Sequence, residues 1–299
     1  MMRIGYFGDG PWAHKAFRKL NDDKTIEIAF VAVRYDKRDP VLLSLAEEYH
    51  IPTEIHQDIN SDEFVNRMKT YHADLFVSMS FNQIFKNRMI HLPEQKTINC
   101  HAGNLPFYRG RNILNWVLMN DEKAFGITVH YVDEGIDTGD IILQRTFPIT
   151  DQDTYRTLLD RAYTGCAEIL YDAVKQIQNN EVKAIRQDTI DRVGMYCGMR
   201  KPGDERIDWN STSREIFNFV RALCAPGPMA SSFINGKEIR IGRVSEIKEA
   251  RAYINIPGQI IGKTDRGFYV KTKDTFVEVT EYEYGGKIKV GDRMTWERY

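Results

Sequence analysis

Apolar runs and amphipathic segments alternate through the first half of the chain. Six apolar runs with the length of buried strands lie at residues 3–7, 26–33, 73–78, 97–101, 127–132 and 141–145. Three segments with helical spacing lie at residues 12–20, 41–50 and 61–71, and Ser61 is the expected N-cap of the last one. Strands that lack a polar face and alternate with helices predict a parallel sheet with helices on both sides.

Two further patterns follow in the second half. Seven apolar side chains share one helical stripe and predict a long helix: Leu158, Leu159, Ala162, Cys166, Ile169, Leu170 and Val174. From about residue 227 the pattern changes to alternation, with a hairpin signal at Asn235-Gly236. We therefore expect an α/β fold: a Rossmann-like parallel-sheet domain over residues 1–203, then a small antiparallel, barrel-like β domain over residues 204–299.

Composition narrows the class of protein. The 299 residues include 41 basic and 42 acidic side chains, a formal net charge of −1. A charge so near zero predicts no dedicated nucleic-acid surface, although a local basic patch is compatible with it. The four cysteines form no C-x-x-C pair, which predicts free thiols and no zinc site. Because neither a signal-peptide pattern nor an apolar run of ~20 residues is present, we expect a cytoplasmic protein without a membrane partner.

The first predicted strand leads into a glycine turn, "GYFGDGPWAH" at residues 5–14. Gly8 and Gly10 form the G-x-G that begins a dinucleotide-binding motif, but Ala13 takes the third glycine position and Pro11 crowds the turn. A dinucleotide site and a tight strand-to-helix turn without a cofactor both fit this segment. The residues favour the turn.

The apolar run at residues 97–101 contains two polar side chains, Asn99 and His101. Residues i and i+2 of a strand point to the same side, so both side chains are expected to project from the strand's carboxyl end, where open α/β sheets bind ligands. A core histidine that satisfies a backbone carbonyl is the alternative. Gly103 and Gly110 in the following loop permit close approach of a ligand and favour a functional site.

Four carboxylates lie in a short loop between two predicted strands: Asp133, Glu134, Asp137 and Asp140. Three interpretations are open: the carboxylates form a solvated acidic loop, they bind Mg²⁺, or one of them pairs with His101 and raises its pKa. An amide that donates to an oxyanion, an imidazole that moves a proton and a carboxylate that orients it suit acyl or formyl transfer. No G-x-S-x-G elbow is present, so direct attack by the substrate is expected.

These segments resemble the formyltetrahydrofolate-dependent formyltransferases. That family combines N-x-H, an L-P-x-Y-R-G loop and a D-x-G-D-T-G-like segment, which read here "NCHAGNLPFYRG" and "DEGIDTGD". The resemblance implies N10-formyltetrahydrofolate as co-substrate, no metal, and a catalytic trio of Asn99, His101 and Asp137. It also implies backbone contacts with the pterin of the folate at four positions: Gln83, Phe85, Val132 and Asp133.

The resemblance also bears on the acceptor of the formyl group. "RGRNILNWVL" at residues 109–118 is similar to the R-G-R-x-x-L-N-W of enzymes that formylate an amino sugar on a uridine nucleotide. Arg109, Arg111 and Asn104 are therefore expected to bind a UDP-sugar, with a pseudaminic acid pathway as the most specific expectation. Trp116 is expected to pack behind this loop. Methionyl-tRNA formyltransferase and formyltetrahydrofolate hydrolase are the alternatives, no nucleic-acid partner is expected, and the exposed β domain is compatible with a homodimer.

Overall fold

The structure, a computed structural model, describes residues 1–296 and divides into two compact units. Unit 1 comprises Met1–Gly110, Phe125–Phe147 and Asp160–Cys197. Unit 2 comprises Arg111–Ala124, Pro148–Leu159 and the chain from Gly198 onward. These units do not coincide with the predicted division after residue 203, because Arg111–Ala124 and Pro148–Leu159 pack with the C-terminal part of the chain. As a division of the sequence, that boundary stays a prediction.

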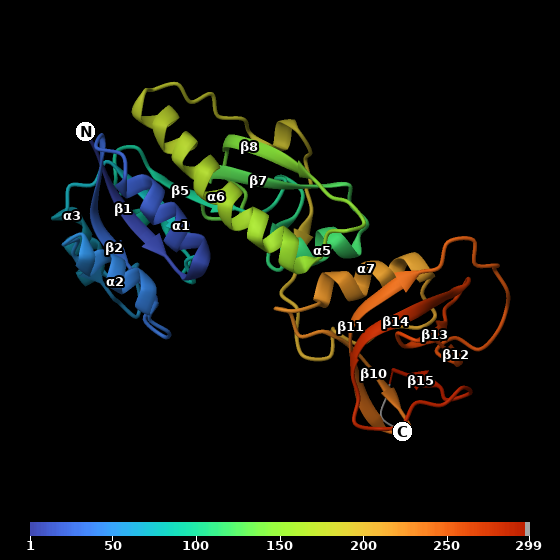
Figure 1. Ribbon diagram of the computed structural model, residues 1–299. Coiled ribbons are helices and arrows are strands. Elements are labelled where there is room, and N and C mark those ends of the chain that lie inside the picture. Colours follow the sequence, from blue (N-terminus) through green and yellow to red (C-terminus); the bar gives the residue numbers. More distant parts are fainter. Residues whose placement is uncertain (297–299) are drawn as a thin grey trace. The chain divides into compact units, whose positions relative to one another are not determined.

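Unit 1 is built on a seven-stranded sheet with the order β3-β2-β1-β4-β5-β7-β8 (Figure 1). Its strands are β1 (Met2–Gly8), β2 (Ile26–Ala32), β3 (Thr53–Glu54), β4 (Leu75–Met79), β5 (Thr97–His101), β7 (Ala124–Tyr131) and β8 (Ile141–Pro148). Pairing is parallel from β3 through β5, which confirms the predicted parallel sheet. Strand β7 instead runs antiparallel to β5, a direction that an apolar run does not encode.

Helices cover the sheet of unit 1. They are α1 (Gly10–Asn21), α2 (Pro40–Glu48), α3 (Asp62–Lys69), the short α4 (Asn87–Ile90) and most of α6 (Tyr155–Gln178). The Ser61 hydroxyl accepts from the Phe64 amide at 3.2 Å, so the predicted cap of α3 is confirmed. All seven stripe residues of α6 are buried, and Arg161 stacks over the Phe125 ring of β7. This packing places α6 against the sheet edge that holds β7.

Unit 2 contains an antiparallel sheet that curls into a half-barrel (Figure 1). Its strands, in the order β12-β13-β14-β11-β10-β15, are β10 (Ala230–Ile234), β11 (Lys237–Glu246), β12 (Ile260–Lys263), β13 (Phe268–Lys271), β14 (Phe276–Glu283) and β15 (Met294–Thr295). Asn235 and Gly236 join β10 to β11 with φ of +50° and +74°, the conformation of the predicted hairpin turn. The expected antiparallel, barrel-like second domain is confirmed.

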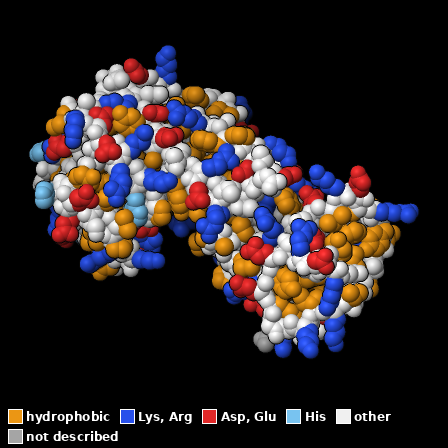
Figure 2. Space-filling model, in the orientation of Figure 1, with side chains coloured by type: hydrophobic (Ala, Val, Ile, Leu, Met, Phe, Trp, Pro, Cys, Tyr) orange, Lys and Arg blue, Asp and Glu red, His pale blue; other side chains and the backbone are white. Residues whose placement is uncertain are grey.

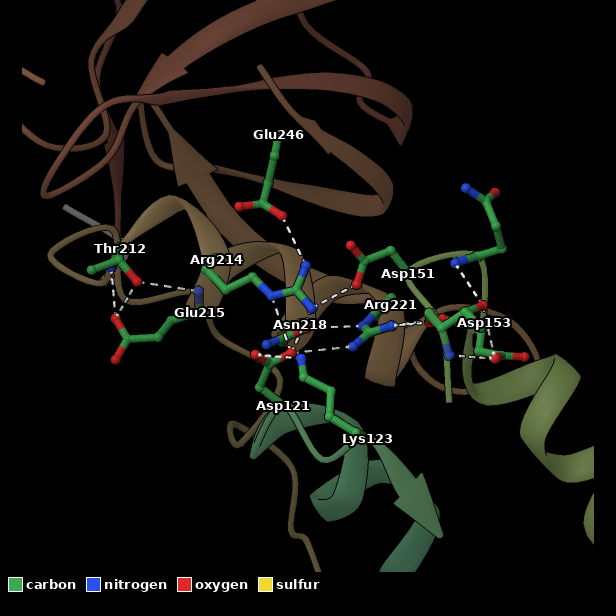
Figure 3. A network of polar contacts seen from close by, with 12 residues as sticks. Asp121, Lys123, Asp151, Asp153, Thr212, Arg214, Glu215, Asn218, Arg221 and Glu246 are labelled. Atoms are coloured by element: carbon green, nitrogen blue, oxygen red, sulfur yellow. Dashed lines mark hydrogen bonds and ion pairs between the residues drawn. The ribbon is translucent and has the colours of Figure 1, made fainter. Parts of the chain in front are cut away.

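Helix α7 (Ser213–Leu223) holds the separate segments of unit 2 together. Arg214 on α7 binds the carboxylates of Asp121, Asp151 and Glu246 at 2.5, 2.6 and 3.0 Å (Figure 3). These three acids come from three different parts of the sequence. One guanidinium therefore links residues 111–124, residues 148–159 and the C-terminal sheet.

Helix α5 (Ile113–Met119) packs against α7 within unit 2. The Asn115 side-chain amide donates to the Ala222 carbonyl oxygen at 2.6 Å, and the Trp116 indole N–H donates to the Gly198 carbonyl oxygen at 3.0 Å. This hydrogen bond anchors the Trp116 ring within unit 2, and its packing behind the loop stays a prediction.

The structure also bears on the expectations about the cysteines and about membrane spans. All four cysteines are free, and Cys100, Cys166 and Cys197 are buried. Over residues 1–296, none of the helices combines the length and the apolar character needed to cross a membrane.

Candidate active site

Asn99 and His101 lie at the carboxyl end of β5, which runs between β4 and β7. Their spacing of two residues directs both side chains to one side of the sheet. His101 is 9 % exposed, and its Nε2 lies 2.7 Å from the carbonyl oxygen of Tyr108. A carbonyl oxygen only accepts, so Nε2 carries a hydrogen and the Nδ1 of a neutral ring has none.

Asp137 lies in the loop between β7 and β8 and faces that bare nitrogen. One carboxylate oxygen is 3.5 Å from His101 Nδ1 and accepts the Gly110 amide at 2.8 Å. Burial alone would raise the pKa of Asp137, but His101, His130 and the Gly110 amide hold it below its usual range. Asp137 is therefore an ionised carboxylate beside His101, the third of the options that the sequence left open for the acidic loop.

Of the remaining options, the solvated acidic loop describes the other three carboxylates, because Asp133, Glu134 and Asp140 are exposed. Asp133 accepts from the Gly135 amide and the Thr138 hydroxyl, at 3.1 and 2.6 Å, so it stabilises the turn. Within residues 1–296 no group of three or more His, Cys, Asp or Glu side chains has a metal-binding arrangement. The acidic loop thus shapes the backbone and presents Asp137.

His130 lies beside Asn99 and Asp137, and it was not predicted from the sequence. It sits on β7 directly opposite Asn99 in the antiparallel register and is 2 % exposed. Its Nδ1 lies 2.8 Å from the Tyr131 carbonyl oxygen, and its Nε2 is 3.3 Å from the Asn99 amide nitrogen and 3.6 Å from Asp137 Oδ1. His130 therefore lies between Asn99 and Asp137, with its Nε2 within hydrogen-bond distance of Asn99. The available signal was a histidine inside an apolar run, which gains meaning only from the strand register.

Burial decides the charge of His101. It lowers the pKa of His101 below the usual value, although the Asp137 carboxylate and the Tyr108 carbonyl oppose that shift. Asp137 does raise the pKa of His101, as predicted for a paired carboxylate, but burial lowers it by more, so the predicted net rise is wrong. The resting imidazole is neutral and can accept a proton at Nδ1.

The predicted pterin-binding positions lie in unit 1. The Gln83 side chain accepts from the Ile59 amide and donates to the His56 carbonyl, both at 3.0 Å, so it is already occupied. Phe85 is buried against Phe7, with ring centroids 4.9 Å apart. A contact with folate at these positions would therefore use the backbone, as expected, and it stays a prediction along with contacts at Val132 and Asp133.

The three residues predicted to bind the acceptor have different surroundings. The Arg109 guanidinium donates to Gln187 Oε1 and to the Val193 carbonyl oxygen, so it joins two segments of unit 1. Arg111 is exposed in unit 2, and its guanidinium lies 3.9 Å from the Met199 sulfur. The Asn104 side-chain oxygen is buried without a hydrogen-bond partner among the described residues. Of the three, Arg111 offers the most accessible charge.

Comparisons with known proteins extend over both units. The formyl transferase family matches residues 2–174, and the C-terminal domain of formyl transferases matches residues 200–298. The methionyl-tRNA formyltransferase of Halalkalibacterium halodurans is 30% identical over 295 residues, which cover 96% of this chain and 91% of that protein. The methionyl-tRNA formyltransferase of Alkaliphilus oremlandii is 31% identical over 301 residues and covers 98% and 95%.

A solved structure shares the fold at lower identity. The N-formyltransferase from Helicobacter canadensis, in complex with folinic acid and dTDP-3-aminofucose, superposes with a TM-score of 0.70 at 22% identity. The match covers 95% of this chain and all of that chain. At this identity the likeness extends to the fold alone.

These findings overturn the predicted nucleotide-sugar acceptor, because near-full-length relatives at about 30% identity are methionyl-tRNA formyltransferases. Two reasons explain the error. In "RGRNILNW" the Asn115 and Trp116 side chains hold unit 2 together through backbone carbonyls, so they carry no information on the acceptor. The net charge of the whole chain, which argued against RNA, also averages two parts of opposite sign.

Proposed function

Because the chain belongs to the formyl transferase family, which uses N10-formyltetrahydrofolate as its formyl donor, we propose that it formylates the amino group of methionyl-tRNA. The observation that carries this proposal is the match to methionyl-tRNA formyltransferases over nearly the whole of both proteins. Such a match includes the C-terminal domain as well as the domain that holds Asn99, His101 and Asp137. At about 30% identity over nearly the whole chain, these relatives are a better guide to the acceptor than one loop motif.

The distribution of charge supports an RNA partner. Residues 200–299 contain 18 Lys and Arg against 14 Asp and Glu, a formal +4, whereas residues 1–199 contain 23 against 28, a formal −5. Figure 2 shows several Lys and Arg side chains projecting from the surface of unit 2. A positively charged domain attracts phosphates and raises the rate of encounter with RNA.

The residues around His101 fit a formyl donor. When bound, formyltetrahydrofolate supplies an electrophilic formyl carbon, and attack on it places negative charge on the formyl oxygen. One Asn99 N–H donates to His130 Nε2, and the second has no partner among the described residues. Because the His130 Nδ1–H donates to the Tyr131 carbonyl, His130 Nε2 is an acceptor and fixes the Asn99 amide. The second Asn99 N–H is then preorganised to stabilise the oxyanion.

Proton transfer falls to His101 in this proposal. The attacking amine must lose a proton, and the bare Nδ1 of a neutral His101 can accept it directly or through water. Ionised Asp137, 3.5 Å away, stabilises the imidazolium that forms. When the tetrahedral intermediate collapses, the bond from the formyl carbon to N10 breaks and this proton passes to N10, directly or through water, so that neutral tetrahydrofolate leaves. The Nε2–H bond to Tyr108 keeps the ring from turning during this step.

An acceptor assay tests the proposal. The protein is incubated with formyl-labelled N10-formyltetrahydrofolate and, in separate reactions, methionyl-tRNA, uncharged tRNA, free methionine or no acceptor. We expect label on methionyl-tRNA only. A His101→Ala protein serves as the inactive control and His91→Ala, an exposed histidine of unit 1, as the active one.

The other outcomes are also informative. Label that remains off every tRNA sample while formate accumulates without an acceptor would point to a hydrolase. Equal labelling of free methionine and methionyl-tRNA would contradict an RNA acceptor, because the basic unit 2 would then have no part in recognition.

A further inference from the structure

Gln187 lies beside the proposed catalytic group, and both its side-chain nitrogen and its side-chain oxygen form hydrogen bonds. It begins the 3₁₀ turn Gln187–Thr189 and is 3 % exposed. Its Nε2 donates to the carbonyl oxygens of Asp137 and Gly139, each at 2.8 Å. Its Oε1 accepts from Arg109 Nε and Nη2 at 3.1 and 2.8 Å. Only one orientation of the amide satisfies two carbonyls and one guanidinium, so these roles are fixed.

Asp137 needs such support because its backbone is in an uncommon conformation. Its φ is +55°, in the left-handed region that residues with a Cβ seldom adopt. Gly139, two residues later, approaches Tyr131 so closely that an added Cβ would lie 1.9 Å from the Tyr131 carbonyl oxygen. The two N–H groups of the Gln187 amide bind the carbonyl oxygens of the residues before and after Thr138, and so stabilise this tight turn.

The same segment connects to the carboxylate through a second route. Arg109 and Gly110 form the short strand β6 (Arg109–Gly110), which pairs with β9 (Tyr196–Cys197). The Gly110 amide donates to the Asp137 carboxylate, and the Arg109 side chain donates to Gln187. The Gly110 amide therefore holds the side chain of Asp137. Gln187, which Arg109 binds, holds the Asp137 backbone.

We propose that Gln187 is a positioning residue, which holds Asp137 in the conformation that directs its carboxylate at His101 Nδ1. This inference rests on the proposed function, since it treats Asp137 as part of the catalytic group. Gln187 acts through the backbone of Asp137 and not through contact with a substrate.

The test compares Gln187→Met with Gln178→Met. Methionine matches glutamine in length but neither donates nor accepts strongly, so Gln187→Met loses all four hydrogen bonds. Gln178 is the matched control, because its amide donates to the Thr25 carbonyl at 2.9 Å in the same unit, away from His101. Arg109→Met is a third variant, which removes the guanidinium and leaves the two Gln187 donors in place.

Two measurements separate positioning from stability. We expect Gln187→Met to lower kcat for formyl transfer about tenfold to a hundredfold with a smaller change in KM, because misplaced groups slow the chemical step. We also expect NMR titration of the His101 ring to give a lower pKa than in the wild type, since the opposing carboxylate moves away. Gln178→Met should match the wild type in both, and Arg109→Met should show a smaller effect than Gln187→Met.

A folded Gln187→Met protein with wild-type kcat and a wild-type His101 titration would overturn the proposal. If Gln187→Met does not fold, Gln187→Glu decides, because its carboxylate keeps the Arg109 pair but loses both donors to the turn. Wild-type kcat and a wild-type His101 titration in folded Gln187→Glu would then overturn the proposal. The NMR titration needs no acceptor, so a failure of the methionyl-tRNA assay with an altered His101 titration would reject the acceptor and retain the role of Gln187.

Discussion

Asn99 and His130 are direct partners across the β5–β7 pair, with the Asn99 amide nitrogen 3.3 Å from His130 Nε2. Their meeting depends on one antiparallel register in a sheet that is otherwise parallel up to β5. A shift of β7 by one residue would place His130 on the opposite face of the sheet from Asn99. The register of these two strands therefore orients the amide that the proposed mechanism uses.

Replacing His130 should slow catalysis without removing it. In His130→Leu the Asn99 amide loses its fixed acceptor, so we expect kcat to fall about tenfold while KM for the formyl donor changes less. His130→Gln can accept from Asn99 through its side-chain oxygen and should recover part of the rate. Steady-state kinetics of the three proteins would decide, and a His130→Leu enzyme as fast as the wild type would show that Asn99 needs no such partner.

Removing either polar residue at the end of β5 should have a larger effect. We expect His101→Ala and Asn99→Ala to lower kcat about 10²-fold or more, because one loses the proton acceptor and the other the oxyanion donor. Single-turnover formyl transfer measures the chemical step directly. Wild-type rates in either variant, with His91→Ala as the matched control, would contradict the assignment.

The sequence predicted the parts of this site that depend on local pattern. Spacing along one strand brought Asn99 and His101 to the same side, and the family resemblance selected Asp137 among four acids. The sequence did not predict His130, because the role of His130 depends on which strand pairs with β5 and in what register. Gln187 escaped for a similar reason: it lies 50 residues from Asp137 and meets it only through tertiary contacts.

The fold followed the same division between local and distant information. Helix α6 and the Asn235-Gly236 hairpin were predicted because periodicity and turn chemistry are local. The membership of residues 111–124 in unit 2 was not, since it depends on Asn115 bonding to the Ala222 carbonyl, 107 residues away.

The pH dependence of the reaction should report on His101. Its lowered pKa keeps the ring neutral at pH values where an exposed histidine, with a pKa of about 6.5, is already half charged. Protonation of His101 should therefore slow formyl transfer only below that value. In Asp137→Asn the opposing carboxylate charge is gone, so the acidic limb should move to still lower pH while the maximal rate drops. Because the acceptor's amine also titrates in a rate profile, NMR titration of the His101 ring in both proteins decides, and a wild-type pKa above about 6.5 would contradict the prediction.

Arg214 should make a large contribution to the stability of unit 2. It joins three carboxylates, and its own pKa is raised by its bond to Asp151 and by those to Asp121 and Glu246. We expect Arg214→Met to lower the free energy of unfolding by about 1–3 kcal/mol, because three segments lose a shared charge-assisted partner. The matched control is Arg240→Met. Arg240 is exposed and 3.7 Å from Glu238, so its removal should cost less than about 0.5 kcal/mol. Chemical denaturation that gave equal losses for both would contradict the role of Arg214.

Basic side chains of β11 provide a test of how the acceptor binds. Lys237 and Arg243 are exposed and have no carboxylate partner among the described residues. If unit 2 binds the phosphates of methionyl-tRNA, Lys237→Gln with Arg243→Gln should raise KM for methionyl-tRNA severalfold and make log KM less steep against log salt concentration by up to about two. The catalytic rate at saturating methionyl-tRNA should stay unchanged, because both residues lie in unit 2, whereas Asn99, His101 and Asp137 belong to unit 1. Lys24→Gln with Lys69→Gln, two basic residues of unit 1, controls for the loss of charge. An equal rise in KM in the two double variants would show that unit 2 has no special part in binding RNA.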